Sequence, residues 1–217
     1  MALAERVIYV VDDDALVVES AALLLNLSGY VVKTFHSGVE FLAQAPSVQL
    51  GCVLLDIHMP ELTGMEVLKR LKEQDLRFAV VMLTGMGDVG LAVRAMKCGA
   101  VDFIEKPYSH EALLAAVREG FSRLDTSAAG ELATEDARLR IAQLSLRERE
   151  VLQRLLSGWP NKVIAYQLGL STRTVEMYRA NVMDKLQARG LPMAVRLGLA
   201  AGLQPVEDRE PARRQSN

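Results

Sequence analysis

The stretch VLLDIHMP at residues 53–60 runs from apolar residues to a carboxylate and closes on a proline. Its apolar part is typical of a strand buried in a sheet. Asp56 at the end of such a strand has two explanations. Strands often stop at polar turn residues, or Asp56 is a nucleophile held at the mouth of a sheet. The surrounding sequence distinguishes between them.

Short apolar runs alternate with amphipathic segments of helix length through residues 1–124. The expected strands span 6–11, 31–35, 52–55, 78–83 and 101–104, and the expected helices span 15–27, 39–43, 64–73, 89–98 and 111–124. This alternation predicts an α/β fold, a doubly wound five-stranded parallel sheet with helices on both faces. In such sheets, functional residues gather at the carboxyl ends of the strands.

The charge of the chain is distributed unevenly. Residues 1–124 carry 16 acidic and 11 basic side chains, a net charge of −5, whereas residues 145–203 carry 4 acidic and 9 basic ones, a net charge of +5. We therefore expect two domains with different partners, the basic one being the candidate for nucleic acid. Solvated surface alone is the alternative explanation for the basic charges.

The remaining composition favours a cytoplasmic protein without a membrane span. No apolar run approaches the roughly 18 residues that a span needs, and charges interrupt the first residues where a signal peptide would be apolar. Cys52 and Cys98 do not form a disulfide framework.

The second part of the chain has a different sequence pattern, without predicted strands. Residues 125–136 are small and polar, and after residue 137 the expected elements are helices at 145–156, 162–168, 172–187 and 193–201. The predicted domains are 5–121 and 137–202, with a linker at 122–136 and a polar, disordered tail at 203–217.

Polar side chains stand at the carboxyl ends of four expected strands. Asp12 and Asp13 follow the first strand, Asp56 ends the third, Thr84 ends the fourth and Lys106 follows the fifth. Taken singly, such residues are often helix caps or surface charges, and Asp14 is expected to cap the helix from Ala15. Several of them at one edge of a sheet indicate a site.

Clustered carboxylates at this edge predict a cation site. Like charges about 4 Å apart cost roughly 1–4 kcal/mol, and a divalent cation with oxygen ligands such as Mg²⁺ removes that cost. Asp13 and Asp56 would bind the ion directly, Asp12 through water, and His58 through its backbone carbonyl. Asp56 could then attack phosphorus and form an aspartyl phosphate, with Lys106 and Thr84 contacting the phosphoryl oxygens.

Residues 5–121 resemble the receiver domain of bacterial two-component response regulators, a flavodoxin-like fold. The matching stretches are VVDDD (10–14), LLDIHMP (54–60), TGMGD (84–88) and GAVDFIEKP (99–107). The resemblance implies that Asp56 is the phosphoacceptor and that Asp12 and Asp13 form the acidic pocket.

The same resemblance assigns the switch. It implies that Thr84 is the switch hydroxyl, that Lys106 contacts the phosphate, that Phe103 is the switch aromatic, and that the Lys106–Pro107 peptide is cis. His58 and Met86 stand where the family varies, so the lifetime of the phosphate is left open.

Residues 161–180, NKVIAYQLGLSTRTVEMYRA, predict two helices around a tight Gly-Leu-Ser turn. In the second helix Val175, Tyr178, Val182 and Leu186 recur on one face, which we expect to be buried. The candidate DNA contacts, on the first helix and on the other face of the second, are Asn161, Lys162, Arg173, Thr174, Glu176, Met177, Arg179 and Lys185. An ordinary helical hairpin with solvated charges is the alternative.

Residues 137–202 look like the LuxR-type helix-turn-helix domain of FixJ/NarL response regulators, closest to the FixJ branch. The two resemblances together imply a DNA-binding transcriptional regulator, an activator, that a sensor histidine kinase phosphorylates. Its partners would be that kinase, double-stranded DNA and RNA polymerase. It would not be an enzyme apart from its own phosphotransfer and slow autodephosphorylation.

Phosphorylation would act through the surface formed by residues 89–98, 101–104 and 111–124. Val93, Met96 and Lys97 are the candidate contacts of a phosphorylated homodimer. Dimerisation, or release of the DNA-binding domain from masking by the receiver, would then promote DNA binding.

Two other classes of protein are weighed against this interpretation. A phosphatase of the haloacid dehalogenase type needs a second Asp two residues after the nucleophile, where this chain has His58. A LuxR regulator gated by a small molecule needs a ligand cavity, where this chain has the acidic pocket.

Overall fold

The computed structural model describes residues 6–85, 89–125 and 130–206, and the chain divides into two compact units. The first is built around a sheet, and the second consists of the helices in residues 131–217 together with the short segment Val89–Val93. Met86 and the tail from residue 207 lie outside the described residues, as does the segment 126–129 of the predicted linker.

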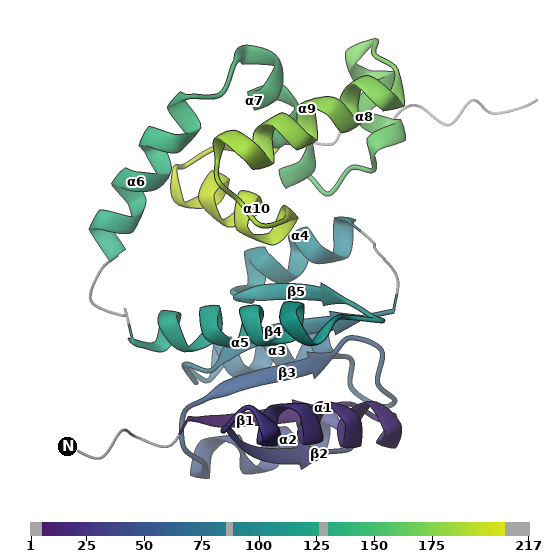
Figure 1. The fold of residues 1–217 in the computed structure, drawn as a ribbon, viewed down its shortest axis with the longest axis vertical. Helices are drawn as coiled ribbons and strands as arrows, with labels where there is room; N and C mark the ends of the chain where they lie inside the picture. The colour runs from purple at the N-terminus through teal and green to yellow at the C-terminus, as the bar shows by residue number, and fades with distance from the viewer. Residues whose placement is uncertain (1–5, 86–88, 126–129, 207–217) are drawn as a thin grey trace, which may run out of the picture. The chain divides into compact units, whose positions relative to one another are not determined.

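The first unit contains a five-stranded, all-parallel sheet (Figure 1). Its strands are β1 Val7–Val11, β2 Val31–Phe35, β3 Cys52–Asp56, β4 Ala79–Thr84 and β5 Asp102–Glu105, in the order β2-β1-β3-β4-β5. Every residue of β1, β3 and β4 is buried, which explains their continuous apolar sequences. The predicted fold class is confirmed.

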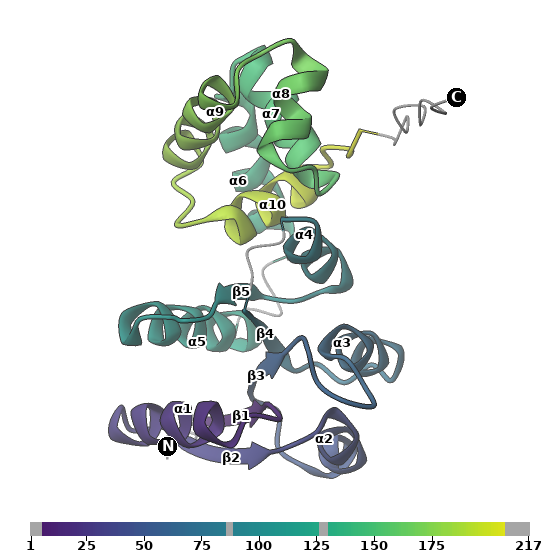
Figure 2. The same cartoon turned by 90° about the vertical axis from the view of Figure 1, so that its right-hand side faces the viewer.

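Helices cover both faces of the sheet (Figure 2). They are α1 Ala15–Leu27, α2 Gly38–Gln44, α3 Gly64–Glu73, α4 Val89–Cys98 and α5 His110–Asp125, with a 3₁₀ turn at Ala45–Ser47. Helices α1 and α5 lie on one face and bury one apolar cluster with the strands. On the other side of the sheet, Tyr9 packs against the rings of Phe41 and Phe78, with centroids 5.8 and 5.7 Å away.

The predicted strands and helices of this unit are present with small shifts at their ends. Strands β4 and β5 each begin and end one residue later than expected. Thr84 is therefore the last residue of β4, paired in register with Glu105 of β5.

The second unit is helical, with α6 Gly130–Ala142, α7 Leu146–Leu156, α8 Asn161–Leu168, α9 Thr172–Lys185 and α10 Leu191–Ala200. Helix α6 occupies residues that the sequence assigned to the linker and to the start of the second domain. Ala137 and Ile141 of α6 and Leu144 just after it are buried and recur at steps of four and three, a helical spacing that could have revealed this helix. The domain boundaries themselves stay predictions.

The helix ends follow from their capping residues. Ser145 and Glu148 form a capping box at the start of α7, with the Ser145 hydroxyl accepting from the Glu148 N–H at 3.3 Å. Gly169 ends α8 with φ +66°, a left-handed conformation that glycine adopts without steric cost. Ser171 caps α9 by accepting from the Thr174 N–H at 3.0 Å.

None of the helices in the described part of the chain combines the length and the apolar character of a membrane span.

Gly64 begins α3 where that helix passes close to the end of β3. A Cβ at this position would lie 2.1 Å from the carbonyl oxygen of Asp56. We expect Gly64→Ala to lower the free energy of unfolding of the first unit by about 1–3 kcal/mol, because the backbone must move to relieve the contact. Denaturant unfolding followed by circular dichroism measures this change.

Gly85→Ala is the matched control, because no atom lies within 4 Å of a Cβ built there. Equal stability of the Gly64→Ala and Gly85→Ala variants would contradict the proposed close approach.

Candidate functional site

The order of the strands brings the predicted polar residues to one edge of the sheet. Strands β1, β3, β4 and β5 are consecutive neighbours, so their carboxyl ends lie side by side. Asp12, Asp56 and Thr84 are 1%, 5% and 0% exposed. Two buried carboxylates need compensating partners.

Lys106 supplies that compensation. Its Nζ lies 2.5 Å from Asp12 Oδ2 and 2.6 Å from Asp56 Oδ1, so that one ammonium bridges the ends of β1 and β3. Burial alone would lower the pKa of Lys106, but its hydrogen bonds to the two carboxylates outweigh burial and raise that pKa. The lysine is therefore held in its charged form.

At Asp12, unlike at Lys106, burial has a larger effect on the pKa than hydrogen bonding. Burial raises the pKa of this carboxyl, although the hydrogen bonds from Lys106 and from the Asp14 backbone oppose the shift. The Asp14 N–H donates to Asp12 Oδ1 at 3.0 Å. Asp14 itself caps α1 by accepting from the Leu16 N–H at 2.9 Å, as predicted.

The loop after β3 orients the Asp56 carboxylate. The His58 N–H donates to Asp56 Oδ2 at 2.6 Å, while the other oxygen faces Lys106. The turn is fixed by two backbone hydrogen bonds of 3.0 Å, from the Ile57 N–H to the Leu83 carbonyl and from the Gly64 N–H to the Ile57 carbonyl. Asp56 therefore presents its oxygens at a rigid strand end.

Carboxylate oxygens of Asp12, Asp13 and Asp56 lie within 4.8 Å of one another. Such an all-oxygen donor set, exposed at Asp13 and buried at the other two residues, fits a hard divalent cation that keeps part of its water shell. Receiver domains bind Mg²⁺ in an acidic pocket of this kind.

The switch residues stand on β4, β5 and the loop that follows. The Lys106 N–H donates to the Thr84 carbonyl at 2.5 Å, and the Lys106–Pro107 peptide is cis, as expected. Phe103 is half-buried on β5 opposite Met82.

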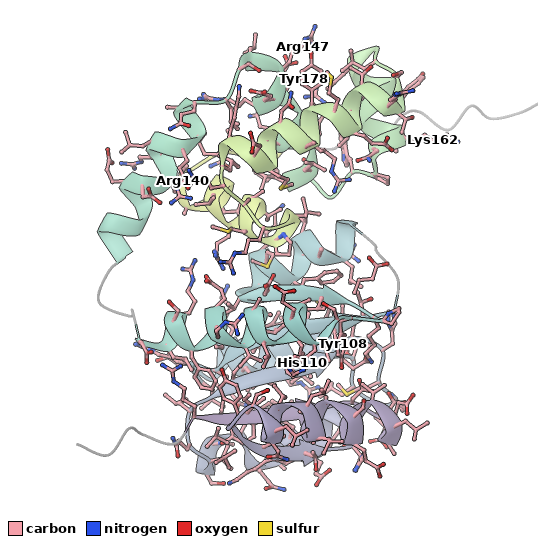
Figure 3. The ribbon with its side chains drawn as sticks, in the orientation of Figure 1. Tyr108, His110, Arg140, Arg147, Lys162 and Tyr178 are labelled. Carbon is pink, nitrogen blue, oxygen red and sulfur yellow. The ribbon has the colours of Figure 1, made fainter. Side chains whose placement is uncertain are left out.

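Tyr108 was missed by the sequence analysis. It is half-buried and packs at the edge of the α1–α5 cluster, and burial raises the pKa of its hydroxyl (labelled in Figure 3). Its position just after Lys106–Pro107 was the only signal in the sequence.

In the helical unit, α8 and α9 pack around a small core. Val151, Leu155, Ile164, Ala165 and Val175 form this cluster, with Trp159 and Tyr178 packed at its edge. Arg173, Glu176 and Met177 are exposed on α9, and Lys162 is exposed on α8.

The other candidate DNA contacts already have partners within the unit. Arg179 is half-buried and donates to Asn161 Oδ1 at 2.7 Å, and burial lowers its pKa. The Thr174 hydroxyl lies 2.7 Å from that of Ser171. Lys185 Nζ lies 2.7 Å from Glu148 Oε2, joining α9 to α7. Whether these residues touch DNA stays a prediction.

The candidate dimer residues differ in exposure. Val93 and Met96 are buried, at 2% and 6% exposed, and Lys97 is exposed.

Comparison with known proteins finds a family match in each part of the chain. Residues 8–118 match the model of the response regulator receiver domain, and residues 142–197 match that of bacterial regulatory proteins of the luxR family. The transcriptional regulatory protein FixJ of Azorhizobium caulinodans is 47% identical over 94% of this chain and 97% of its own length. FixJ of Rhizobium meliloti is 42% identical over 94% of this chain and 100% of its own.

A solved structure of full-length FixJ from B. japonicum matches with a TM-score of 0.56 and 44% identity, covering 93% of this chain and 99% of that one. A receiver domain joined to a LuxR-type helical domain defines a response regulator of transcription. The chain belongs to the FixJ-like response regulators.

Membership of this family indicates the classes of partner. The receiver implies a sensor kinase as its phosphodonor, and the LuxR-type domain implies DNA binding. The family is one of regulators, not of classical enzymes.

Glu148 is 4% exposed and serves both the capping box of α7 and the ion pair with Lys185. Burial alone would raise the pKa of Glu148, but hydrogen bonds from Lys185 and Ser145 outweigh burial and lower that pKa. Its contribution to stability is therefore fully present above the pKa of an unfolded Glu, about 4.3, and is lost as the pH falls through the lower folded value. We expect Glu148→Gln, which can keep the cap, to lower the free energy of unfolding by about 1–3 kcal/mol at pH 7.

The loss should shrink below about pH 4, where the wild-type carboxylate becomes protonated. Glu150→Gln is the control, because Glu150 pairs with Arg147 at 2.8 Å on the surface and such pairs contribute about 0–1 kcal/mol. Thermal unfolding at several pH values measures both. A Glu148→Gln effect that does not depend on pH would refute the role of the charge.

Proposed function

We propose that this protein is a transcriptional activator that a cognate sensor histidine kinase switches on by phosphorylating Asp56. The observation that carries the proposal is the Lys106 bridge, with Nζ 2.5 Å from Asp12 and 2.6 Å from Asp56. A buried carboxylate beside a lysine and an acidic trio is suited to accept a phosphoryl group and to hold its charge.

The chemistry is a transfer between two side chains. An oxygen of Asp56 attacks the phosphorus of a phosphohistidine; a P–O bond forms while the P–N bond breaks, and the imidazole leaves with the electron pair. Lys106 then exchanges its contact with Asp56 for a phosphoryl oxygen, and the Thr84 hydroxyl donates to another. Slow autodephosphorylation is the attack of water on the same phosphorus, which returns the carboxylate and inorganic phosphate.

Asp12, Asp13, Asp56 and the His58 carbonyl would hold the metal ion. When bound, Mg²⁺ neutralises charge on the transferring phosphoryl group. The buried Asp12 and Asp56 orient the site, and the exposed Asp13 leaves room for water.

Thr84 and Phe103 would carry the signal away from the phosphate. Phe103 is half-buried on β5, so an inward turn behind a displaced Thr84 needs little rearrangement. The consequence would be a new surface that includes Val93, Met96 and Lys97, used in a homodimer or in releasing the DNA-binding unit. Either route promotes promoter binding, and a dimer would read an inverted repeat.

On DNA, α9 would enter the major groove. Its exposed Arg173, Glu176 and Met177 are suited to reading base edges, and Lys162 at the start of α8 to binding a phosphate. Activation then implies contact with RNA polymerase, and a kinase and DNA as partners support a cytoplasmic location.

Asp56→Asn should abolish stable phosphorylation and keep the fold, because the amide retains the shape of the side chain but is a poor nucleophile. Incubation with acetyl phosphate and Mg²⁺ should add one phosphoryl group to the wild type and none to the variant, read by intact-protein mass. Size exclusion and promoter-binding assays on the same samples report the switch.

Two outcomes would overturn the proposal. One is an Asp56→Asn variant that binds and activates like the phosphorylated wild type under kinase-active conditions. The other is turnover of phosphate monoesters, which would indicate a phosphatase. A hydrophobic ligand that activates the protein without any response to phosphodonor would instead favour a ligand-gated regulator.

Arg173→Ala should weaken binding to a duplex selected from a random library by the activated wild type. The loss of one base or phosphate contact predicts a fall of about 1–3 kcal/mol, or roughly 5- to 150-fold. Fluorescence anisotropy measures it, and Arg138→Ala, which removes the same charge from exposed α6, is the control. Equal affinities of the two variants for the duplex would contradict the proposal that α9 contacts DNA.

A further inference from the structure

The C-terminal end of α9 receives a side chain from α6, the helix that the sequence analysis did not foresee. Arg140 Nη1 donates to the carbonyl oxygen of Leu186 at 3.1 Å, and Leu186 is the C-cap of α9. Arg140 is labelled in Figure 3. Its Nε also lies 2.9 Å from Asp136 Oδ2, one turn earlier on α6. We infer that Arg140 is a positioning residue for the recognition helix α9.

The chemistry of a helix end favours this contact. The last carbonyls of a helix have no partner within the helix, and the negative end of its dipole attracts a cation. Arg140 satisfies both needs at Leu186, and its planar guanidinium can donate there while Asp136 fixes its rotamer. The geometry is thus defined by two partners.

Apolar packing makes the connection stiff. Ile141 and Leu144 belong to the same buried cluster as Val182 and Leu186 of α9. A second polar contact, from Arg149 Nη2 of α7 to the Ile141 carbonyl at 3.3 Å, anchors the end of α6. A shift of α6 therefore displaces the end of α9, and this end is set by packing together with Arg140.

The expected consequence is specific. Base readout depends on the angle at which a helix enters the groove, whereas attraction to phosphates depends mainly on charge. The side chain of Arg140 is 28% exposed, and its donors are directed at Leu186 and Asp136. Removing it should weaken binding to the selected duplex and leave binding to unrelated DNA nearly unchanged.

The test compares Arg140→Met, Arg140→Lys and Arg138→Met in the full chain, activated with beryllofluoride and Mg²⁺. Arg138 lies on the same helix, 63% exposed and paired only loosely with Glu135 at 3.6 Å, so its loss changes the charge equally. Fluorescence anisotropy is measured on the selected duplex and on a scrambled duplex of the same length, at several salt concentrations and below the melting temperature of each variant.

We expect Arg140→Met to lose about tenfold in affinity for the selected duplex and less than twofold for the scrambled one, with an unchanged salt slope. Arg140→Lys, which can still donate to Leu186, should recover most of the loss, and Arg138→Met should bind both duplexes like the wild type. An equal loss on both duplexes, a salt slope reduced by about one phosphate contact, or no loss at all would each overturn the inference.

This inference rests on the proposed recognition role of α9, and the two can fail separately. If Arg173→Ala lowers affinity for the selected duplex but Arg140→Met does not, only the positioning role is lost. If neither variant changes it, the recognition role of α9 is lost as well.

Discussion

One ammonium group between two buried carboxylates holds the functional edge of the sheet together. Lys106 reaches Asp12, just after β1, and Asp56, at the end of β3, and its positive charge compensates both buried acids. The bridge spans the central pair of strands, so it ties the stability of the fold to the chemistry of the site. In the proposed phosphorylation of Asp56, the incoming phosphoryl group would compete with Asp56 for this lysine, which would make the edge a switch.

The sequence was informative where local patterns and chemistry agree. Continuous apolar runs identified β1, β3 and β4 because these strands are buried on both faces. Parallel topology then placed Asp12, Asp56 and Lys106 at a common edge, although the distances between them had to come from the structure. Ser145 and Gly169 marked helix ends because capping depends on neighbouring residues alone.

The sequence was less informative where a residue's role depends on distant partners. The first half of helix α6 was read as part of a linker because residues 125–136 are mostly small and polar. Its end is fixed by distant partners, since Ile141 and the following Leu144 are buried in a cluster with residues of other helices. Lys185 was predicted to contact DNA from its place on α9, but the sequence did not indicate that its ammonium pairs with Glu148, 37 residues earlier. The position of Tyr108 depends on its packing against the α1–α5 cluster, and no local sequence pattern predicts such packing.

The Arg140 contact also bears on how such regulators can be recombined. The match to the luxR family begins at residue 142, yet the donor that completes the end of α9 lies before it, and the acid that orients that donor lies earlier still, at Asp136. A chimaera joined at the family boundary would contain the helix-turn-helix domain but would lack the Arg140 contact to the end of α9. A junction before Asp136 would transfer the domain together with Asp136 and Arg140, and so with the contact proposed to orient α9.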